Sequence, residues 1–479
     1  CVINGIREVT TMALAVYNDL TRKKEEFVPI KEGKVSFYVC GPTVYDYFHI
    51  GNARPFVVFD VFRRYLEFSG YEVAYIQNFT DIDDKLIRRA NEMGITVPEL
   101  ADRFIKEYYE DADALGIKRA TMNPRATHEI DEIIKIVLKL IERGHAYEAD
   151  GDVYFDVPSF PEYGKLSKQG IEELQSGARI EVDERKKSPL DFTLWKASKP
   201  GEPFWDSPWG PGRPGWHIEC SAMSTKYLGD TIDFHGGGSD LIFPHHENEI
   251  AQSECSCGRR FVNYWVHNAF ITIDKEKMSK SLGNFMTVRD IRQKYNPLVL
   301  RYFLLSSHYR SPINFSKEGL EQAQSALERL GNCNADMNFA IGNRKAGEKD
   351  EVLSEAIKTA WTGMKGSMDD DFNTAGAIGC IFDAVRAINV HLSEHKDADM
   401  ETLAEAQKFF AAVNDIFGFF PTASASNGED SEIEALITER NEARKAKNFK
   451  RSDEIRDLLA AKGIIIEDTP QGTRWKKQL

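Results

Sequence analysis

The stretch KVSFYVCGPTVYDYFHIGNARPF, residues 34–56, decides the fold class of the first domain. Its opening residues, 34–40, mix β-branched and aromatic side chains, which predicts a strand. A loop follows, and Pro55 is predicted to open a helix, because proline is tolerated at the first helical position. Residues 71–77 predict a second strand. This strand–loop–helix–strand unit indicates an α/β, Rossmann-like domain built on a parallel sheet.

The loop between strand and helix contains His49-Ile50-Gly51-Asn52. Free backbone N–H groups and a partial positive charge make a helix N-terminus attractive to phosphate. Gly51 lets a ligand approach the backbone closely, and His49 and Asn52 can donate hydrogen bonds to phosphate oxygens. The alternative is a polar loop whose asparagine caps the helix. Taken alone, the segment favours that alternative.

A second short segment, Lys277-Met278-Ser279-Lys280-Ser281, lies far downstream. Nucleotidyl transfer depends mainly on positioning and on charge stabilisation. Lys277 and Lys280 on a mobile loop are suited to neutralise the β- and γ-phosphates as pyrophosphate leaves. The alternative is a solvated, charged turn.

Metal-ligand residue types gather in three separate places. Cys40 follows the first strand, Cys220 lies in GWHIECSAM, and His245, His246 and Glu249 lie in FPHHENEIAQ. Two thiolates, one imidazole and one carboxylate suit zinc. On a helix Glu249 shares a face with either histidine, so the spacing leaves the choice between them open. The alternative is a set of buried or hydrogen-bonded structural residues.

Length and composition bound the remaining possibilities. The chain has 479 residues, which suggests two to four domains, and a net charge of −14, which argues weakly against nucleic-acid binding. Its seven cysteines are scattered, so we expect a reducing, cytoplasmic location. No long uncharged apolar run is present, so no membrane span is expected.

Composition also divides the chain into segments. We expect the catalytic domain at 12–296, with an insertion at about 120–212, and a helical bundle at 297–421. The small polar residues at 422–430 predict a linker, and 431–479 a compact C-terminal domain.

A local basic patch offsets the acidic average. Residues 440–451 carry six cations and one acid, Glu442. Phe449 and Trp475 belong to the same domain and could stack on unpaired bases. The alternative is a solvated helix face.

Together these segments resemble the cysteinyl-tRNA synthetases. HIGN and KMSKS are similar to the two signatures of class I aminoacyl-tRNA synthetases, and Asn52 is the one departure from HIGH. YVCGPTVYD, NFTDIDDK, PRATH, GWHIECSAM and FPHHENEIAQS resemble the cysteine-specific family from about residue 20 to 475.

The resemblance implies a role for each candidate residue. His49, Gly51, Asn52 and Lys280 would bind ATP, with His49, Asn52, Lys277 and Lys280 acting in catalysis. The zinc ligands would be Cys40, Cys220, His245 and Glu249. Trp216 would pack on the substrate side chain, and Asp240 would accept hydrogen bonds from the ribose of ATP. The bundle would support the tRNA stem, and the C-terminal domain would bind the anticodon.

The implied activity joins L-cysteine to tRNA(Cys) through cysteinyl-adenylate, with ATP and Mg²⁺ as the nucleotide substrate. Zinc would select cysteine over serine through its preference for thiolate, without a separate editing site. Three alternatives remain: a mycothiol cysteine ligase, a non-catalytic tRNA-binding paralogue, and a methionyl-type synthetase. The C-terminal domain disfavours the mycothiol ligase. The signature lysines and the ligand set disfavour a non-catalytic paralogue. The ligand set also disfavours a methionyl-type synthetase.

Overall fold

The computed structural model describes residues 13–170, 184–273, 276–277, 286–420, 423–469 and 472–477. The described chain forms two compact units. One contains Ala13–Ile291 and Tyr309–Phe315, and the other contains Arg292–His308 and Ser316–Leu479. Lys280 lies outside the described residues.

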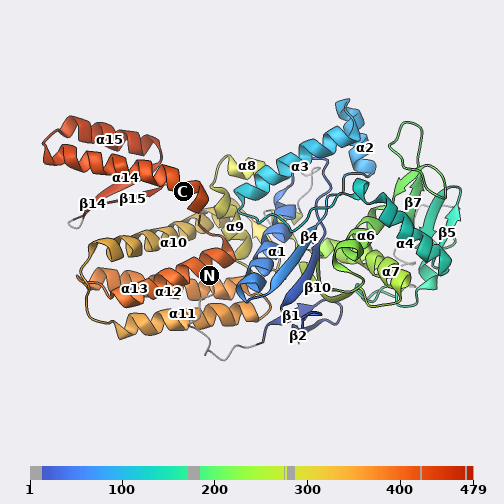
Figure 1. Cartoon of the computed structure of the whole chain (residues 1–479), viewed down its shortest axis with the longest axis horizontal. Helices are drawn as coiled ribbons and strands as arrows, with labels where there is room; N and C mark the ends of the chain where they lie inside the picture. Colours follow the sequence, from blue (N-terminus) through green and yellow to red (C-terminus); the bar gives the residue numbers. More distant parts are fainter. Residues whose placement is uncertain are drawn as a thin grey trace. The chain divides into compact units, whose positions relative to one another are not determined.

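A four-stranded parallel sheet in the order β10-β9-β3-β4 is the centre of the first unit (Figure 1). Tyr38 of β3 lies between Ile76 of β4 and His235 of β9 in the strand register. The elements are β3 (Lys34–Val39), α1 (Ile50–Phe68), β4 (Glu72–Gln77), β9 (Ile232–Gly238) and β10 (Val262–Asn268). The predicted α/β class and parallel sheet are confirmed.

Aromatic packing holds α1 on this sheet. Phe59 of α1 meets Phe37 of β3 edge to face, with ring centroids 5.8 Å apart. Phe59 also lies under Gly236, where an added Cβ would come within 2.9 Å of the ring. Both rings are fully buried. The apolar face of α1 therefore packs on the sheet and fixes the helix N-terminus near the strand ends.

The first unit has further elements outside this sheet, several of them within the predicted insertion at about 120–212. An antiparallel sheet, β5-β6-β7-β8, follows α4 in the chain. The elements are β1 (Ala15–Asn18), β2 (Lys23–Glu26), α2 (Asp84–Met93), α3 (Val97–Ala114), α4 (Ile130–Glu142), β5 (Ala146–Ala149), β6 (Asp152–Phe155), β7 (Phe192–Ala197), β8 (Gly212–Pro214), α6 (Trp216–Leu228), α7 (Glu247–Cys257), β11 (Ile271–Ile273), β12 (Glu276–Lys277), α8 (Val288–Arg292) and β13 (Ile313–Phe315).

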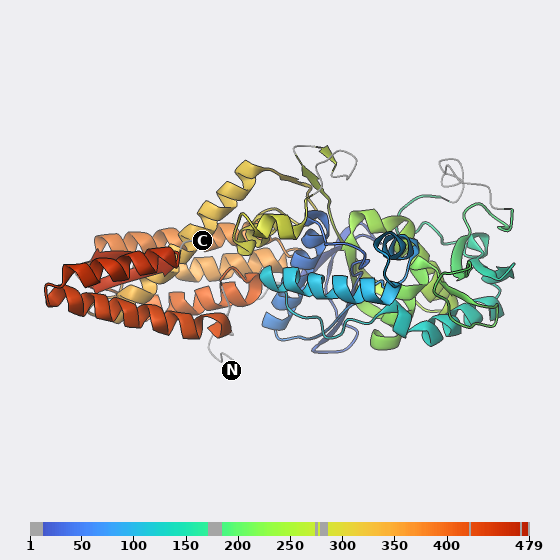
Figure 2. The same cartoon turned by 90° about the horizontal axis from the view of Figure 1, so that it is seen from above.

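The second unit contains a helical bundle and a C-terminal module. Helices α10 to α13 run side by side in both views (Figure 2). The elements are α9 (Pro297–Leu305), α10 (Lys317–Asn343), α11 (Glu351–Asp369), α12 (Thr374–Glu394), α13 (Met400–Phe417), α14 (Ala423–Lys445), α15 (Phe449–Ala461), β14 (Ile464–Thr469) and β15 (Gly472–Lys477). By length and composition α12 could cross a membrane, but its buried face packs within this bundle.

Three sequence expectations need correction. Helix α1 begins at Ile50, not at Pro55, and His49 caps it; the helix continues through the proline at the loss of one backbone hydrogen bond. Helix α14 begins at Ala423, inside the predicted linker, because alanine and serine suit a helix as well as a loop. Residues 309–315, assigned to the bundle, join the first unit because β13 pairs with β11.

Candidate active site and metal centre

The HIGN segment lies at the N-terminus of α1, as the sequence predicts. His49 is the N-cap, and its Nδ1 accepts a hydrogen bond from the backbone N–H of Asn52 at 3.3 Å. The capping residue is thus the histidine and not the asparagine. His49, Gly51 and Asn52 are all partly exposed, so a ligand can reach this end of the helix. A helix N-terminus of this kind suits a phosphate group.

The chain just after KMSKS pairs directly with HIGN. His49 forms an antiparallel bridge with Thr287. The Ile50 N–H donates to the Met286 carbonyl at 3.1 Å, and the Val288 N–H donates to the Phe48 carbonyl at 3.2 Å. The backbone of Lys277 ends the short strand β12. The fold therefore places residues 286–288, shortly after the second motif, against the first motif, although the two motifs lie far apart in the sequence.

The four predicted zinc ligands meet in one buried cluster. Their ligand atoms lie within 4.8 Å of one another. Cys40 follows β3, and Cys220 lies on α6. Glu249 lies in the first turn of α7, which follows β9 in the chain after two short helical segments. The exposed fraction is 8% for Cys40 and lower for the other three ligands. Carboxyl ends of adjacent parallel strands are a usual position for a ligand site.

Short distances define the cluster. The Cys40 Sγ lies 3.8 Å from the Cys220 Sγ and 3.5 Å from the Glu249 Oε1. The same Glu249 oxygen lies 3.0 Å from the His245 Nε2. Two thiols, one imidazole and one carboxylate at this spacing fit zinc.

A second ligand set overlaps the first. Cys40 and Glu249 also lie close to His235 and His246, with the His246 Nε2 3.3 Å from the Cys40 Sγ. However, the His235 Nε2 is already bonded to the Glu249 Oε2 at 2.8 Å, and the His246 Nδ1 to the His267 Nε2 at 2.8 Å. The His235 contact is typical of a residue that orients a metal ligand, whereas His246 is bonded through its Nδ1 and keeps its Nε2 facing Cys40. We therefore favour the set with two thiols.

The acidic and basic side chains of the cluster shift one another's pKa values. A hydrogen bond with Cys40 lowers the pKa of the Cys220 thiol to about 6. Burial opposes ionisation of Glu249, but the charges of His235 and His245 outweigh it and lower the pKa of that carboxyl to about 2. Burial lowers the pKa of His245, and the neighbouring Glu249 and Cys220 more than reverse this and raise it to about 10. The cluster therefore offers anionic ligands that a cation can neutralise.

Sequence reasoning missed a chain of side chains behind the cluster. The Asp19 carboxylate bonds to the His267 Nδ1 at 2.7 Å, and His267 in turn bonds to His246. The Nδ1 atoms of His217 and His245 lie 2.9 Å apart. Single residues at strand and helix ends leave no pattern in the sequence, so only the fold brings them together. They fix the ring orientations beside Cys40 and His245.

Trp216 and Asp240 lie at the edge of this region. The Trp216 side chain is 44% exposed, and its ring centroid is 4.5 Å from that of His245. Asp240 is exposed in a short turn after β9, and its Oδ1 lies so close to Gly238 that an added Cβ would come within 2.3 Å. Both positions can face a bound molecule.

The packing of His246 requires a glycine at position 237. A Cβ at this position would come within 2.8 Å of the His246 ring. The glycine-rich end of β9 therefore leaves the room that the histidine occupies.

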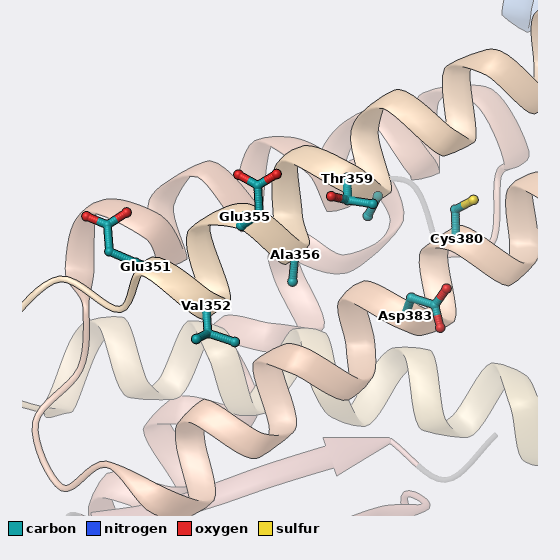
Figure 3. A pocket seen from close by; sticks show the side chains of 8 residues that line it. Glu351, Val352, Glu355, Ala356, Thr359, Cys380 and Asp383 are labelled. Atoms are coloured by element: carbon teal, nitrogen blue, oxygen red, sulfur yellow. The ribbon is translucent and has the colours of Figure 1, made fainter.

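A separate groove of about 540 Å³ lies on α11 and α12 (Figure 3). None of the predicted site residues lines it. Its lining consists of Glu351, Val352, Glu355, Ala356, Thr359, Ala360, Cys380 and Asp383.

Comparison with known families agrees with these features. Residues 26–325 match the class I (C) tRNA synthetase catalytic domain, 365–421 match the DALR domain, and 426–475 match the cysteinyl-tRNA ligase anticodon binding domain. The cysteine–tRNA ligase of Caldicellulosiruptor saccharolyticus is 55% identical over 466 residues, which are 97% of this chain and 100% of that protein. The enzyme of Anoxybacillus flavithermus is 56% identical over 469 residues, with 97% and 100% covered.

Solved structures share the fold at low sequence identity. Methionyl-tRNA synthetase of Mycobacterium tuberculosis, in complex with methionyl-adenylate, is 15% identical with a TM-score of 0.60, covering 80% of this chain and 92% of that one. A leucyl-tRNA synthetase of Agrobacterium radiobacter K84 is 10% identical with a TM-score of 0.58, covering 82% and 85%. With 97% of its length matched by curated relatives that are 55–56% identical, the chain belongs to the cysteine–tRNA ligase family of class I aminoacyl-tRNA synthetases.

Proposed function

We propose that this enzyme activates L-cysteine with ATP, transfers it to tRNA(Cys), and selects cysteine through a zinc ion held by Cys40, Cys220, His245 and Glu249. The observation that carries the proposal is the convergence of these four ligand atoms within 4.8 Å, close to the carboxyl end of the central sheet. When bound, zinc supplies a soft cation that prefers a thiolate to a neutral hydroxyl. Serine, which has the hydroxyl, is otherwise nearly isosteric with cysteine.

The remaining residues of this region bind and orient the amino acid. Trp216 lies over the His245 ring and leaves nearly half of its surface exposed, so its indole can cover a small side chain. The hydrogen bond between the His235 Nε2 and the Glu249 Oε2 holds this carboxylate in one orientation. A rigid, buried ligand set gains selectivity because it cannot adapt to a different side chain.

ATP would be bound by the signature residues. The N-terminus of α1, with His49 and Asn52, offers donors to phosphate oxygens, and Asp240 offers an acceptor to the ribose hydroxyls. Magnesium would accompany the nucleotide. Lys277 and Lys280 would stabilise the negative charge that develops on the leaving pyrophosphate. The cysteine carboxylate attacks the α-phosphate, and a terminal ribose hydroxyl of the tRNA then takes the cysteinyl group.

The C-terminal module offers a limited RNA surface. Arg440 is buried, and both it and Arg444 pair with Asp468, while Arg451 pairs with Glu439. These three cations of the basic run therefore stabilise the module.

The RNA contacts of this module would come from the turn between its helices. Within the described residues, no ion pair involves Lys445, Lys447 or Lys450 around that turn. Phe449, beside them, is 63% exposed and remains a candidate for base stacking. Trp475 packs against the module's apolar core of Ile433, Ile437, Ile455, Leu459 and Ile464, which argues against the stacking role expected for it.

Amino-acid discrimination tests the proposal. Cysteine- and serine-dependent pyrophosphate exchange are compared for the wild type and for Cys220→Ala with measured zinc content. We expect strong preference for cysteine in the wild type and a loss of that preference when the thiolate is removed. Efficient serine activation by the zinc-loaded wild type would refute selection by zinc.

A further inference from the structure

Arg54 is a fully buried cation close to both signature motifs. It lies on α1, five positions after the His49 cap, and its exposed fraction is 0%. Its Nη1 donates to the carbonyls of Ala269 and Phe270 at 2.7 and 3.0 Å. Its Nη2 donates to the Ser311 carbonyl at 2.6 Å. One guanidinium thus holds three main-chain carbonyls from two different segments.

These segments lead to the second signature motif. Phe270 immediately precedes β11, which pairs antiparallel with β12 through Thr272 and Lys277. Ser311 shortly precedes β13, which pairs parallel with β11 from Ile271 and Ile313 onward. Arg54 therefore binds the chain at the point where both strands begin.

The opposite end of the KMSKS segment is tied to the same helix start. The pairing of Phe48, His49 and Ile50 with 286–288 provides that contact. Both chain segments that flank KMSKS are thus hydrogen-bonded to α1 or to the residues that cap it, one by backbone pairing and the other by Arg54.

Burial of this side chain has a free-energy cost. Removal from water lowers the pKa of Arg54 to about 10, so the guanidinium remains charged at neutral pH. The planar guanidinium presents fixed N–H donors in several directions, which a lysine ammonium cannot reproduce. The charged Arg54 side chain therefore holds the carbonyls of Ala269, Phe270 and Ser311 in a defined arrangement, which offsets the cost of its burial.

We propose that Arg54 is a positioning residue for cysteine activation, which fixes the strand leading to Lys277 against the helix whose N-terminus carries His49. The inference rests on the proposed roles of these two residues in ATP activation. A displacement of about 1 Å in a catalytic arrangement can lower a rate about 100-fold. Arg54 does not need to touch ATP to have that effect.

The test is cysteine-dependent ATP–pyrophosphate exchange by Arg54→Gln. We expect kcat to fall about 10- to 100-fold, while the KM for cysteine and the zinc content remain those of the wild type. The KM for cysteine and the zinc content depend on residues that follow β3 or lie on α6 and α7, whereas the Arg54 guanidinium donates to the carbonyls of Ala269, Phe270 and Ser311. Arg54→Lys should have an intermediate kcat, and added guanidinium should partly restore Arg54→Ala.

Arg64→Gln is the matched control. Arg64 lies on the same helix and also ties it to a neighbouring segment, because its Nη2 donates to the Gly116 carbonyl at 2.7 Å. Its Nε pairs with Asp60 of the same helix at 2.7 Å. The Gly116 segment does not lead to KMSKS, so we expect a loss of stability without a comparable fall in kcat.

Several results would overturn the inference. They are a wild-type kcat in Arg54→Gln, an equal fall in Arg64→Gln, or a parallel loss of zinc and cysteine binding. If Arg54→Gln does not fold, Arg54→Lys decides: a reduced kcat supports positioning and a wild-type kcat refutes it. Absence of exchange in the zinc-loaded wild type would refute the proposed function itself, and the inference with it.

Discussion

At the scale of single residues, Glu249 connects the metal cluster to its surroundings. One carboxylate oxygen is held by the His235 Nε2 at 2.8 Å, and the other faces the His245 Nε2 at 3.0 Å and the Cys40 Sγ at 3.5 Å. The side chain is fully buried, so water cannot replace these contacts. Its two oxygens therefore have separate tasks: one fixes the orientation, and the other is available as a ligand.

Two substitutions distinguish the ligand sets. Cys220→Ala removes a thiolate from the favoured set only, so we expect stoichiometric zinc to be lost. His246→Gln removes an orienting residue, so zinc should remain with an affinity about 10- to 100-fold weaker. Zinc content by atomic emission and competition with a chelating dye give the two quantities. Full zinc binding in Cys220→Ala together with its loss in His246→Gln would favour the set with His235 and His246.

The same cluster predicts how metal affinity depends on pH. In the metal-free chain the pKa of His245 is about 10, and burial raises the pKa of the Cys40 thiol, so both carry protons at neutral pH. Zinc must displace these protons, and a higher pH therefore favours binding. We expect zinc affinity to rise at least about tenfold per pH unit between pH 6 and 8. Titrations with a chelator of known affinity measure this slope, and an affinity independent of pH would contradict the assigned ligands.

Not every residue of the site could be predicted from the sequence. Cys40, Cys220 and Glu249 belong to recognisable segments, and their residue types suggest a metal. Spacing alone could not choose between His245 and His246, because both lie within reach of Glu249; the resemblance assigned His245, and the structure offers each histidine in one of two overlapping ligand sets. Asp19 and His267 could not be predicted, since their hydrogen bond joins residues 248 positions apart in the chain.

At the scale of elements, the C-terminal module depends on one carboxylate between helix and hairpin. Asp468 of β14 accepts hydrogen bonds from both Nη atoms of Arg440, each at 2.8 Å, and from Thr473 of β15. The Arg440 side chain is 1% exposed, and Asp468 is 38% exposed. The bonds from Arg440 hold the pKa of Asp468 well below its ordinary value.

Asp468→Asn should destabilise this module. The lost charge pair leaves Arg440 buried with weaker partners, at a cost of about 1–2 kcal/mol, reduced because Asp468 is partly exposed. Hydrogen exchange in α14 and in the hairpin should become faster, while that of the central sheet stays unchanged. Because the folded pKa is depressed, the stabilisation is complete above about pH 4 and is lost as the pH falls. Unchanged exchange in the variant at pH 7 would refute this role.

The helix boundaries show what sequence patterns can specify. The strand–helix–strand order around α1 could be predicted because hydrophobic spacing and the loop agree. The start at Ile50 could not, because histidine is an unusual cap and Pro55 suggested a later start. The start of α14 at Ala423 could not be predicted either, because alanine and serine occur in both loops and helices.

At the scale of the whole molecule, an acidic protein must bind an acidic nucleic acid. The net charge is −14, so we expect the attraction to come from local cations, and we propose Lys445, Lys447 and Lys450 for this role. We propose that the C-terminal module contributes to tRNA charging and that the catalytic unit carries out cysteine activation. This division allows the two steps to be separated experimentally.

Phe449→Ala tests the RNA role of the module. Loss of one stacked base costs about 1–3 kcal/mol, so we expect the KM for tRNA to rise about five- to 150-fold. Pyrophosphate exchange, which needs no tRNA, should be unchanged. Leu458→Ala is the matched control, because Leu458 is also an exposed apolar residue on α15, at 44%. Equal effects of both substitutions would count against stacking by Phe449.

The most direct test of zinc-dependent cysteine selection is charging of total tRNA with labelled cysteine before and after zinc removal by a strong chelator. We predict that the zinc-loaded enzyme forms cysteinyl-tRNA, that the enzyme with verified zinc loss does not, and that added zinc restores charging. Charging that persists after verified zinc loss would contradict selection by zinc.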